Sequence, residues 1–120
     1  MQSKMPLKVY YLDDEQDLCE IFVDYFASNE VEVTTFTDPA KAIDASRESP
    51  PEVLFVDYRL PGTTGDEVAK SLAAEIPKYL ITGDISVKAE YTFQAIFYKP
   101  YKPEDIQQVL DGFLKIKSAA

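Results

Sequence analysis

Five residues with useful chemistry follow short, largely apolar segments of this 120-residue chain. Three carboxylates brought together repel one another unless a cation lies among them, and hard oxygen ligands with room for water suit Mg²⁺. An ammonium and a hydroxyl suit the oxygens of a phosphoryl group. The set therefore permits attack of a carboxylate oxygen on phosphorus, which would form an aspartyl phosphate. These residues are Asp13, Asp14, Asp57, Thr82 and Lys99.

The segment that ends at Asp57 indicates how these residues come together. Residues 53–56 (Val-Leu-Phe-Val) form an uninterrupted apolar run, which is typical of a strand buried on both faces of a parallel sheet. Open α/β sheets bind their ligands beyond the carboxyl ends of the strands. An isolated Asp57 would be interpreted as a turn cap, but the other residues at strand ends favour a shared site.

Strands and helices are expected to alternate along the chain. Asp38 followed by Pro39 is a typical helix start, and Asp66 is expected to cap the third helix. Five strands alternating with helices predict an α/β fold with a doubly wound parallel sheet covered on both faces. The expected strands are 7–12, 32–36, 53–56, 79–81 and 95–98, and the expected helices cover about 18–28, 39–47, 66–76 and 103–117.

Length and composition restrict the class of protein. The chain suits one domain, which we expect over residues 7–117, with a leader at 1–6 and a tail at 118–120. No apolar run approaches the roughly 18 residues of a spanning helix and no signal peptide opens the chain, so we expect a soluble, cytoplasmic protein without membrane contact. A net charge of −9 opposes direct nucleic-acid binding.

Two residue types exclude further chemistry. The chain has no His, which removes imidazole catalysis, His–metal sites and a phosphohistidine of its own. The single cysteine, Cys19, excludes an internal disulfide and is interpreted as a packed thiol on a helix.

Taken in order, these motifs resemble the receiver domain of two-component response regulators. The matching pieces are Asp13-Asp14-Glu15, Asp57, residues 60–65 (Leu-Pro-Gly-Thr-Thr-Gly), Thr82 and Lys99-Pro100. Each motif alone is weak, but together they stand in the correct order and cover nearly the whole chain. The resemblance implies a flavodoxin-like fold with sheet order 2-1-3-4-5.

The resemblance also implies a role for each acidic residue. Asp57 would be the phosphoacceptor, and Mg²⁺ would be the cofactor. Asp14 and Asp57 would be direct metal ligands, together with the backbone carbonyl of Arg59. Asp13 would assist the metal through a water molecule.

The remaining site residues would respond to the phosphoryl group. By the same resemblance, Thr82 is the switch hydroxyl, Lys99 pairs with the phosphoryl group, and the Lys99–Pro100 bond is cis. The phosphodonor would be a histidine kinase or a phosphotransfer protein. Output would pass to a downstream protein partner.

The segment between Thr82 and Lys99 departs from the family pattern. It has 16 residues, fewer than usual, and contains the β-branched Ile85, Val87 and Thr92. After a fifth strand of about four residues, at most about two helical turns would fit, so we predict a shortened, mobile or missing fourth helix.

A second departure concerns the aromatic residue that usually stands three positions before the lysine. Here that position is Ile96. Phe97 cannot replace it without a register shift, because neighbouring strand residues point to opposite faces. Coupling between Thr82 and an aromatic side chain is therefore in question.

A third departure places charges two positions after two key residues. Arg59 follows Asp57 and Asp84 follows Thr82 at this spacing. One hypothesis is that Arg59 and Asp84 pair across the phosphoryl group and slow its hydrolysis. The alternative is two unconnected surface charges, since exposed ion pairs contribute only about 0–1 kcal/mol.

Other classes of function fit the sequence less well. A phosphatase with an Asp nucleophile commonly carries an acid two residues later, whereas Arg59 cannot donate a proton at neutral pH. A degenerate receiver that acts as a constitutive binding module conflicts with five intact site residues, although Ile96 and the short connection favour it. The sequence does not distinguish a free-standing receiver from a piece of a longer regulator or hybrid kinase.

Overall fold

The computed structural model describes residues 5–119, and its centre is a five-stranded parallel sheet. The strand order is β2-β1-β3-β6-β7, which confirms the doubly wound topology expected from the sequence. The strands are β1 (Leu7–Leu12), β2 (Val31–Phe36), β3 (Val53–Val56), β6 (Lys78–Thr82) and β7 (Ile96–Tyr98).

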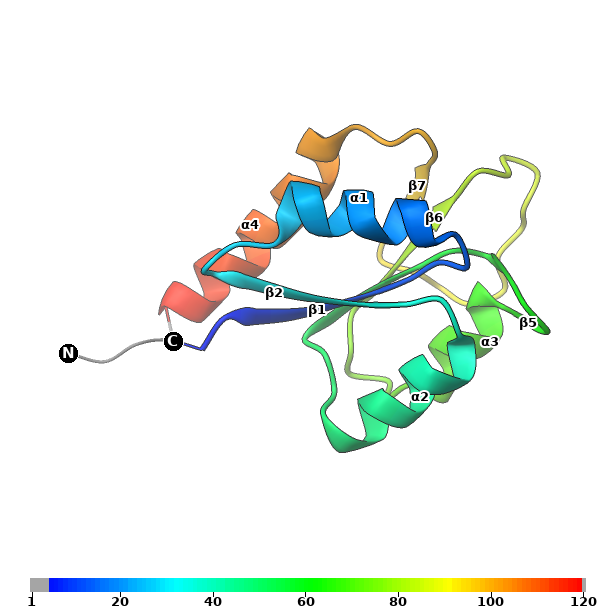
Figure 1. Cartoon of the computed structure of the whole chain (residues 1–120), viewed down its shortest axis with the longest axis horizontal. Coiled ribbons are helices and arrows are strands. Elements are labelled where there is room, and N and C mark those ends of the chain that lie inside the picture. The colour runs from blue at the N-terminus through cyan, green and yellow to red at the C-terminus, as the bar shows by residue number, and fades with distance from the viewer. Residues whose placement is uncertain (1–4, 120) are drawn as a thin grey trace.

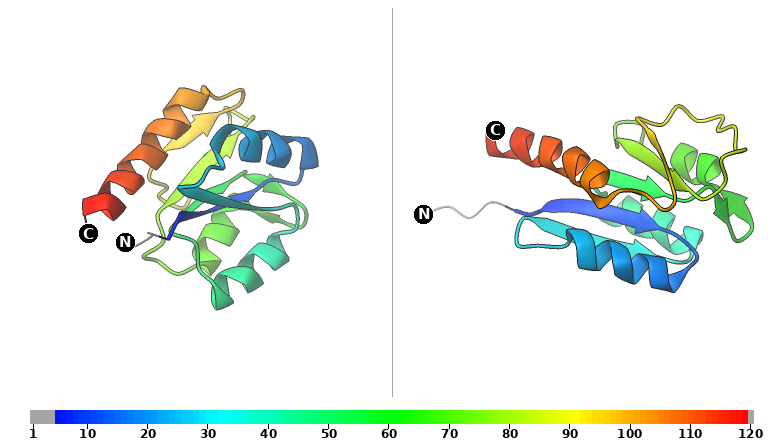
Figure 2. Two further views of the ribbon diagram at one scale, coloured as in Figure 1. Left: turned by 60° about the vertical axis from the view of Figure 1, so that its left-hand side comes forward. Right: turned by 90° about the horizontal axis from the view of Figure 1, so that it is seen from above.

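Helices cover both faces of this sheet (Figure 1). On one face lie α1 (Gln16–Phe26) and α4 (Pro103–Ala119); on the other lie α2 (Pro39–Glu48) and α3 (Gly65–Ser71). Figure 2 shows the same layers from two further directions. All four residues of β3 are buried, because this central strand has a covered side chain on each face.

Each face has its own apolar core. Beneath α1 and α4, Tyr11 stacks on Phe22 with ring centroids 4.3 Å apart, and Phe55 packs beside them. On the opposite face, Leu54 and Leu80 pack with residues of α2 and α3. Because all five strands pair in parallel, their carboxyl ends meet at one edge of the sheet.

One of the two predicted helix caps is wrong. Asp38 caps α2 as expected: its side chain accepts a hydrogen bond from the backbone N–H of Ala40. The cap of α3 is Thr64, whose hydroxyl accepts from the N–H of Glu67. Asp66 instead lies in the first turn, where Oδ2 accepts a 2.7 Å bond from the N–H of Glu90.

A small hairpin follows Asp57 and was not predicted. It consists of β4 (Arg59–Leu60) and β5 (Thr63–Thr64), which pair antiparallel. Gly62 makes the turn with a φ of 70°, a conformation that favours glycine. Two-residue strands are too short to produce a hydrophobic period, so the sequence pattern does not reveal them.

Residues 83–95, all of which the structure describes, contain no helix. The prediction of a shortened or missing fourth helix is confirmed, in the form of a missing one. The segment is held by packing and polar contacts: Phe93 joins the core beneath α3, and the hydroxyl of Tyr91 accepts a 3.2 Å bond from Lys78 Nζ. Lys78 is buried and also donates to the carbonyl of Ala73 at 2.7 Å.

The last helix extends past the expected domain end at residue 117 and includes Ser118 and Ala119. Residues 1–4 of the expected leader, and residue 120 of the expected tail, lie outside the described residues. Among the described helices, none combines the length and apolar character needed to cross a membrane.

Candidate functional site

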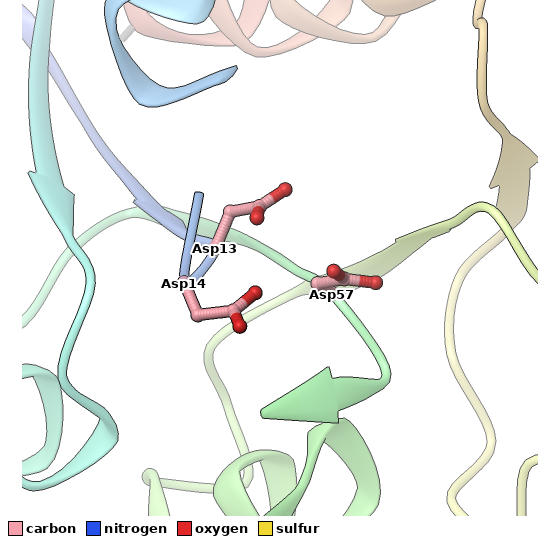
Figure 3. Close-up of side chains that lie close together, drawn as sticks. All are labelled: Asp13, Asp14 and Asp57. Atoms are coloured by element: carbon pink, nitrogen blue, oxygen red, sulfur yellow. The ribbon is translucent and has the colours of Figure 1, made fainter. Parts of the chain in front are cut away.

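Three carboxylates meet at the carboxyl edge of the sheet (Figure 3). Asp13 and Asp14 follow β1, and Asp57 follows β3; one oxygen from each lies within 4.8 Å of the others. Asp13 and Asp57 are buried, whereas Asp14 is exposed. This arrangement of hard oxygen donors, open to water on the Asp14 side, fits a divalent cation such as Mg²⁺.

Lys99 joins two of these carboxylates. Its ammonium lies 2.7 Å from Asp13 Oδ2 and 3.1 Å from Asp57 Oδ2. Lys99 directly follows β7, so the cation comes from the edge strand and reaches across the end of β6. The other oxygen of Asp57 accepts a 2.8 Å bond from the N–H of Tyr58.

Burial and charge oppose each other at this pair. Desolvation raises the pKa of Asp57, while the charge of Lys99 works to lower it. For Lys99, burial alone would lower the pKa of the ammonium, but the hydrogen bond to Asp13 and the charges of Asp13 and Asp57 outweigh it and raise the pKa. The ammonium therefore stays charged beside the phosphoacceptor candidate.

Thr82 ends the strand between Asp57 and Lys99. It is 1% exposed, and its hydroxyl accepts a 3.2 Å bond from the N–H of Asp84. Ile96 is 40% exposed and pairs with Leu80, while Phe97 belongs to the core on the opposite face. Phe97 thus cannot replace the missing aromatic residue, as the strand alternation predicted.

Arg59 and Asp84 form an ion pair beside the site. The guanidinium of Arg59 donates to Asp84 Oδ2 at 2.5 and 3.0 Å. Ser86 also bonds to Asp84, through its hydroxyl and its N–H, and these bonds together with Arg59 lower the pKa of Asp84 to about 2. The side chain of Arg59 is 70% exposed and that of Asp84 is 28% exposed. The structure therefore brings Arg59 and Asp84 together.

Two backbone features shape the same edge. The Lys99–Pro100 bond is cis, as the resemblance implied. A Cβ at Gly65 would lie 2.5 Å from the backbone oxygen of Asp57, so only glycine fits at the start of α3 without moving the backbone at Asp57.

Tyr11 is a site neighbour that the sequence interpretation missed. It is 1% exposed, and its hydroxyl donates a 2.7 Å bond to Asp13 Oδ2. Positions 11 and 13 lie on the same face of an extended chain, and this spacing is a signal that could have found the pair. Cys19 is buried in the same core, as expected of a packed thiol.

The chain is similar in sequence to known bacterial regulatory proteins. MtrA of Mycobacterium tuberculosis, a DNA-binding response regulator, is 25% identical over 109 residues, which cover 85% of this chain and 48% of MtrA. The transcriptional regulatory protein BaeR of Escherichia coli is 23% identical over 106 residues, covering 82% of this chain and 44% of BaeR. The chain thus spans about half the length of these curated relatives.

Solved structures share the fold. A signal receiver domain from an HD domain-containing protein of Pseudomonas fluorescens superposes with a TM-score of 0.84 at 13% identity, covering 97% of this chain and 100% of that one. The BeF3-activated receiver domain of DrrB gives 0.77 at 20% identity, covering 92% and 99%. The model of the response regulator receiver domain family matches residues 9–111. With that match over most of its length, the chain belongs to the response regulator receiver domain family of two-component systems.

Proposed function

We propose that this receiver domain is a phosphoacceptor module in which Asp57 takes a phosphoryl group from a partner phosphohistidine. The observation that carries the proposal is the buried Asp57 carboxylate with Lys99 Nζ at 3.1 Å and two further carboxylates close by. An Asp57 oxygen forms the new bond to phosphorus, the P–N bond of the phosphohistidine breaks, and the imidazole leaves with the electron pair and takes up a proton.

Asp14, Asp57 and the backbone carbonyl of Arg59 would hold Mg²⁺, with Asp13 acting through water. When bound, the metal supplies positive charge that offsets the charge on the transferring oxygens. Lys99 would bind a phosphoryl oxygen, and the Thr82 hydroxyl would move toward another. Apart from its own phosphorylation and dephosphorylation, the domain would catalyse no reaction.

The phosphodonor would be a histidine kinase or phosphotransfer protein, because a chain without His cannot carry the phosphohistidine itself. Output would be a change in protein–protein contacts. Direct nucleic-acid contact by this chain is opposed by its net charge of −9. The DNA binding named for MtrA belongs to a protein about twice as long.

Arg59 and Asp84 would act as a hydrolysis gate. Their ion pair joins the segment after Asp57 to the segment after Thr82, the two segments that would flank a phosphoryl group on Asp57. Holding the two segments together would restrict that approach and lengthen the life of the aspartyl phosphate.

Intact mass after incubation with acetyl phosphate and Mg²⁺ tests the proposal. We expect one added phosphoryl group on the wild type and none on Asp57→Asn, which keeps the shape of the side chain without its charge. Wild-type protein that gains no mass from acetyl phosphate or from a phosphorylated donor protein, and that binds no Mg²⁺ in calorimetry, would instead be a constitutive binding module.

A further inference from the structure

The buried carboxylate of Asp13 has three hydrogen-bond donors, and two of them share one oxygen. Tyr11 OH and Lys99 Nζ each lie 2.7 Å from Oδ2, while the N–H of Glu15 lies 3.0 Å from Oδ1. Asp13 is 0% exposed, so bulk water does not replace a donor that is lost. A buried carboxylate left without a donor costs more free energy than an ordinary hydrogen bond contributes.

Lys99 has a second role that competes with this one. Its ammonium also lies 3.1 Å from Asp57 Oδ2. If Asp57 carries a phosphoryl group, the new anionic oxygens attract the same ammonium and draw it away from Asp13. The hold of Asp13 on Lys99 then opposes the reaction.

We propose that Tyr11 is a positioning residue whose hydroxyl keeps Asp13 Oδ2 bonded while Lys99 moves to the phosphoryl group. This inference rests on the proposed function of Asp57. Tyr11 can serve in this way because its ring is fixed: it stacks on Phe22 at an interplanar angle of 8° within the core beneath α1. Lys99 provides the mobile donor and Tyr11 the stationary one.

A buried tyrosine hydroxyl needs a partner in any case, so the bond alone could be no more than a packing requirement. The chain offers a matched comparison in the preceding residue. Tyr10 is also buried, and its hydroxyl donates a 2.7 Å bond, but to the backbone oxygen of Ser49 rather than to a site residue. Tyr10→Phe therefore removes an equivalent bond without touching Asp13.

The experiment measures the rate of phosphorylation by acetyl phosphate at saturating Mg²⁺ for wild type, Tyr11→Phe and Tyr10→Phe. Calorimetry on the unphosphorylated proteins gives the Mg²⁺ dissociation constants. We expect Tyr11→Phe to react about tenfold more slowly, as the loss of one bond to a buried carboxylate implies. We expect its Mg²⁺ dissociation constant to be unchanged, and Tyr10→Phe to match the wild type in both measurements.

Each contrary result has a separate meaning. A Tyr11→Phe protein that reacts at the wild-type rate overturns the role of Tyr11 and leaves the phosphoacceptor function standing. Equal slowing in Tyr10→Phe also overturns it, because the effect would then follow from any lost tyrosine bond. A wild type that gains no phosphoryl group from acetyl phosphate or from a phosphorylated donor protein, and that binds no Mg²⁺, defeats the proposed function itself.

Discussion

At the scale of single residues, the site balances charges that are costly to bury. Asp57 is 7% exposed and would be an unfavourable anion without the ammonium of Lys99. The same ammonium satisfies Asp13, so one cation compensates two carboxylates in the resting state. An added divalent cation and a phosphoryl group would change the charge compensation of Asp13 and of Asp57 at once. This group of side chains is therefore suited to a switch.

The first prediction concerns the hydrolysis gate of Arg59 and Asp84. We expect Arg59→Ala and Asp84→Ala each to speed loss of the phosphoryl group several-fold, since either change breaks the pair that joins the two segments. The double variant should be no faster than the single ones, because both remove one interaction. The measurement is the decay of phosphorylated protein by intact mass after the donor is removed.

Arg47→Ala is the matched control for this test. Arg47 pairs with Asp44 on the exposed surface of α2, away from the site. Phosphorylated Arg47→Ala should lose its phosphoryl group at the wild-type rate. If Arg59→Ala also decays at the wild-type rate, the pair is an ordinary surface ion pair and the gate does not exist.

The pKa of Asp84 sets the pH range over which the gate should act. Bonds from Ser86 and Arg59 lower this pKa to about 2, from an ordinary value of 3.8. A lowered carboxyl pKa means that the interaction is fully present above the ordinary value and is lost only as pH falls toward 2. The ratio of decay rates for Arg59→Ala and wild type should therefore stay constant between pH 5 and pH 8. If the ratio approaches one as pH falls from 8 to 5, Asp84 does not stay ionised over this range and the prediction is wrong.

Some residue roles could be predicted from the sequence and others could not. The sequence patterns of the strands are clear, and the parallel sheet brings the residues at their carboxyl ends to one edge. These residues are Asp13, Asp14, Asp57, Thr82 and Lys99. The bond between Tyr11 and Asp13 was missed because it depends on the direction of both side chains along β1. The burial of Lys78 was also missed, because it depends on Tyr91 and on backbone carbonyls just after α3. Lysine is rarely buried, so its residue type alone predicts an exposed side chain at position 78.

At the scale of elements, residues 83–95 form an irregular segment in place of a helix, and specific contacts hold this segment to the rest of the domain. Its middle is held by the bond between Glu90 N–H and Asp66 Oδ2, and its far part by Tyr91 and Phe93. The missing helix followed from length and β-branched content, but these contacts did not, because no local pattern connects residue 66 with residue 90. They also leave Ile96 and Tyr98 exposed on the edge strand β7.

Removing the bond from Asp66 should loosen this segment. Asp66 is 4% exposed, and Asp66→Ala leaves the N–H of Glu90 without its partner. We expect faster amide hydrogen exchange over residues 85–93 and a free energy of unfolding lower by about 1–3 kcal/mol. Glu67→Ala, an exposed change in the same turn, should alter neither quantity by a comparable amount. Unchanged exchange in Asp66→Ala would show that the contacts of Tyr91 and Phe93 hold the segment without this bond.

At the scale of the whole molecule, an acidic chain concentrates negative charge at the edge of the sheet where we propose that it accepts a phosphoryl group. The net charge is −9, and three carboxylates lie within 4.8 Å of one another. Lys99 offsets the charges of Asp13 and Asp57, whereas the exposed Asp14 forms no ion pair among residues 5–119. Repulsion at this edge destabilises the metal-free protein, and a bound divalent cation would relieve it.

This repulsion predicts how stability should respond to Mg²⁺. Binding to the folded state stabilises it by RT ln(1 + [Mg²⁺]/Kd), or about 1.4 kcal/mol when the ion is present at ten times its dissociation constant. Asp14→Asn should raise the melting temperature in metal-free buffer, because it removes one of the repelling charges, and should abolish the rise that Mg²⁺ produces. NaCl at matched ionic strength separates this effect from general screening of a chain with charge −9. If the melting temperature rises equally with both salts, the effect comes from the overall charge and not from the Asp13–Asp14–Asp57 cluster. The same conclusion follows if the melting temperature of Asp14→Asn still rises with Mg²⁺.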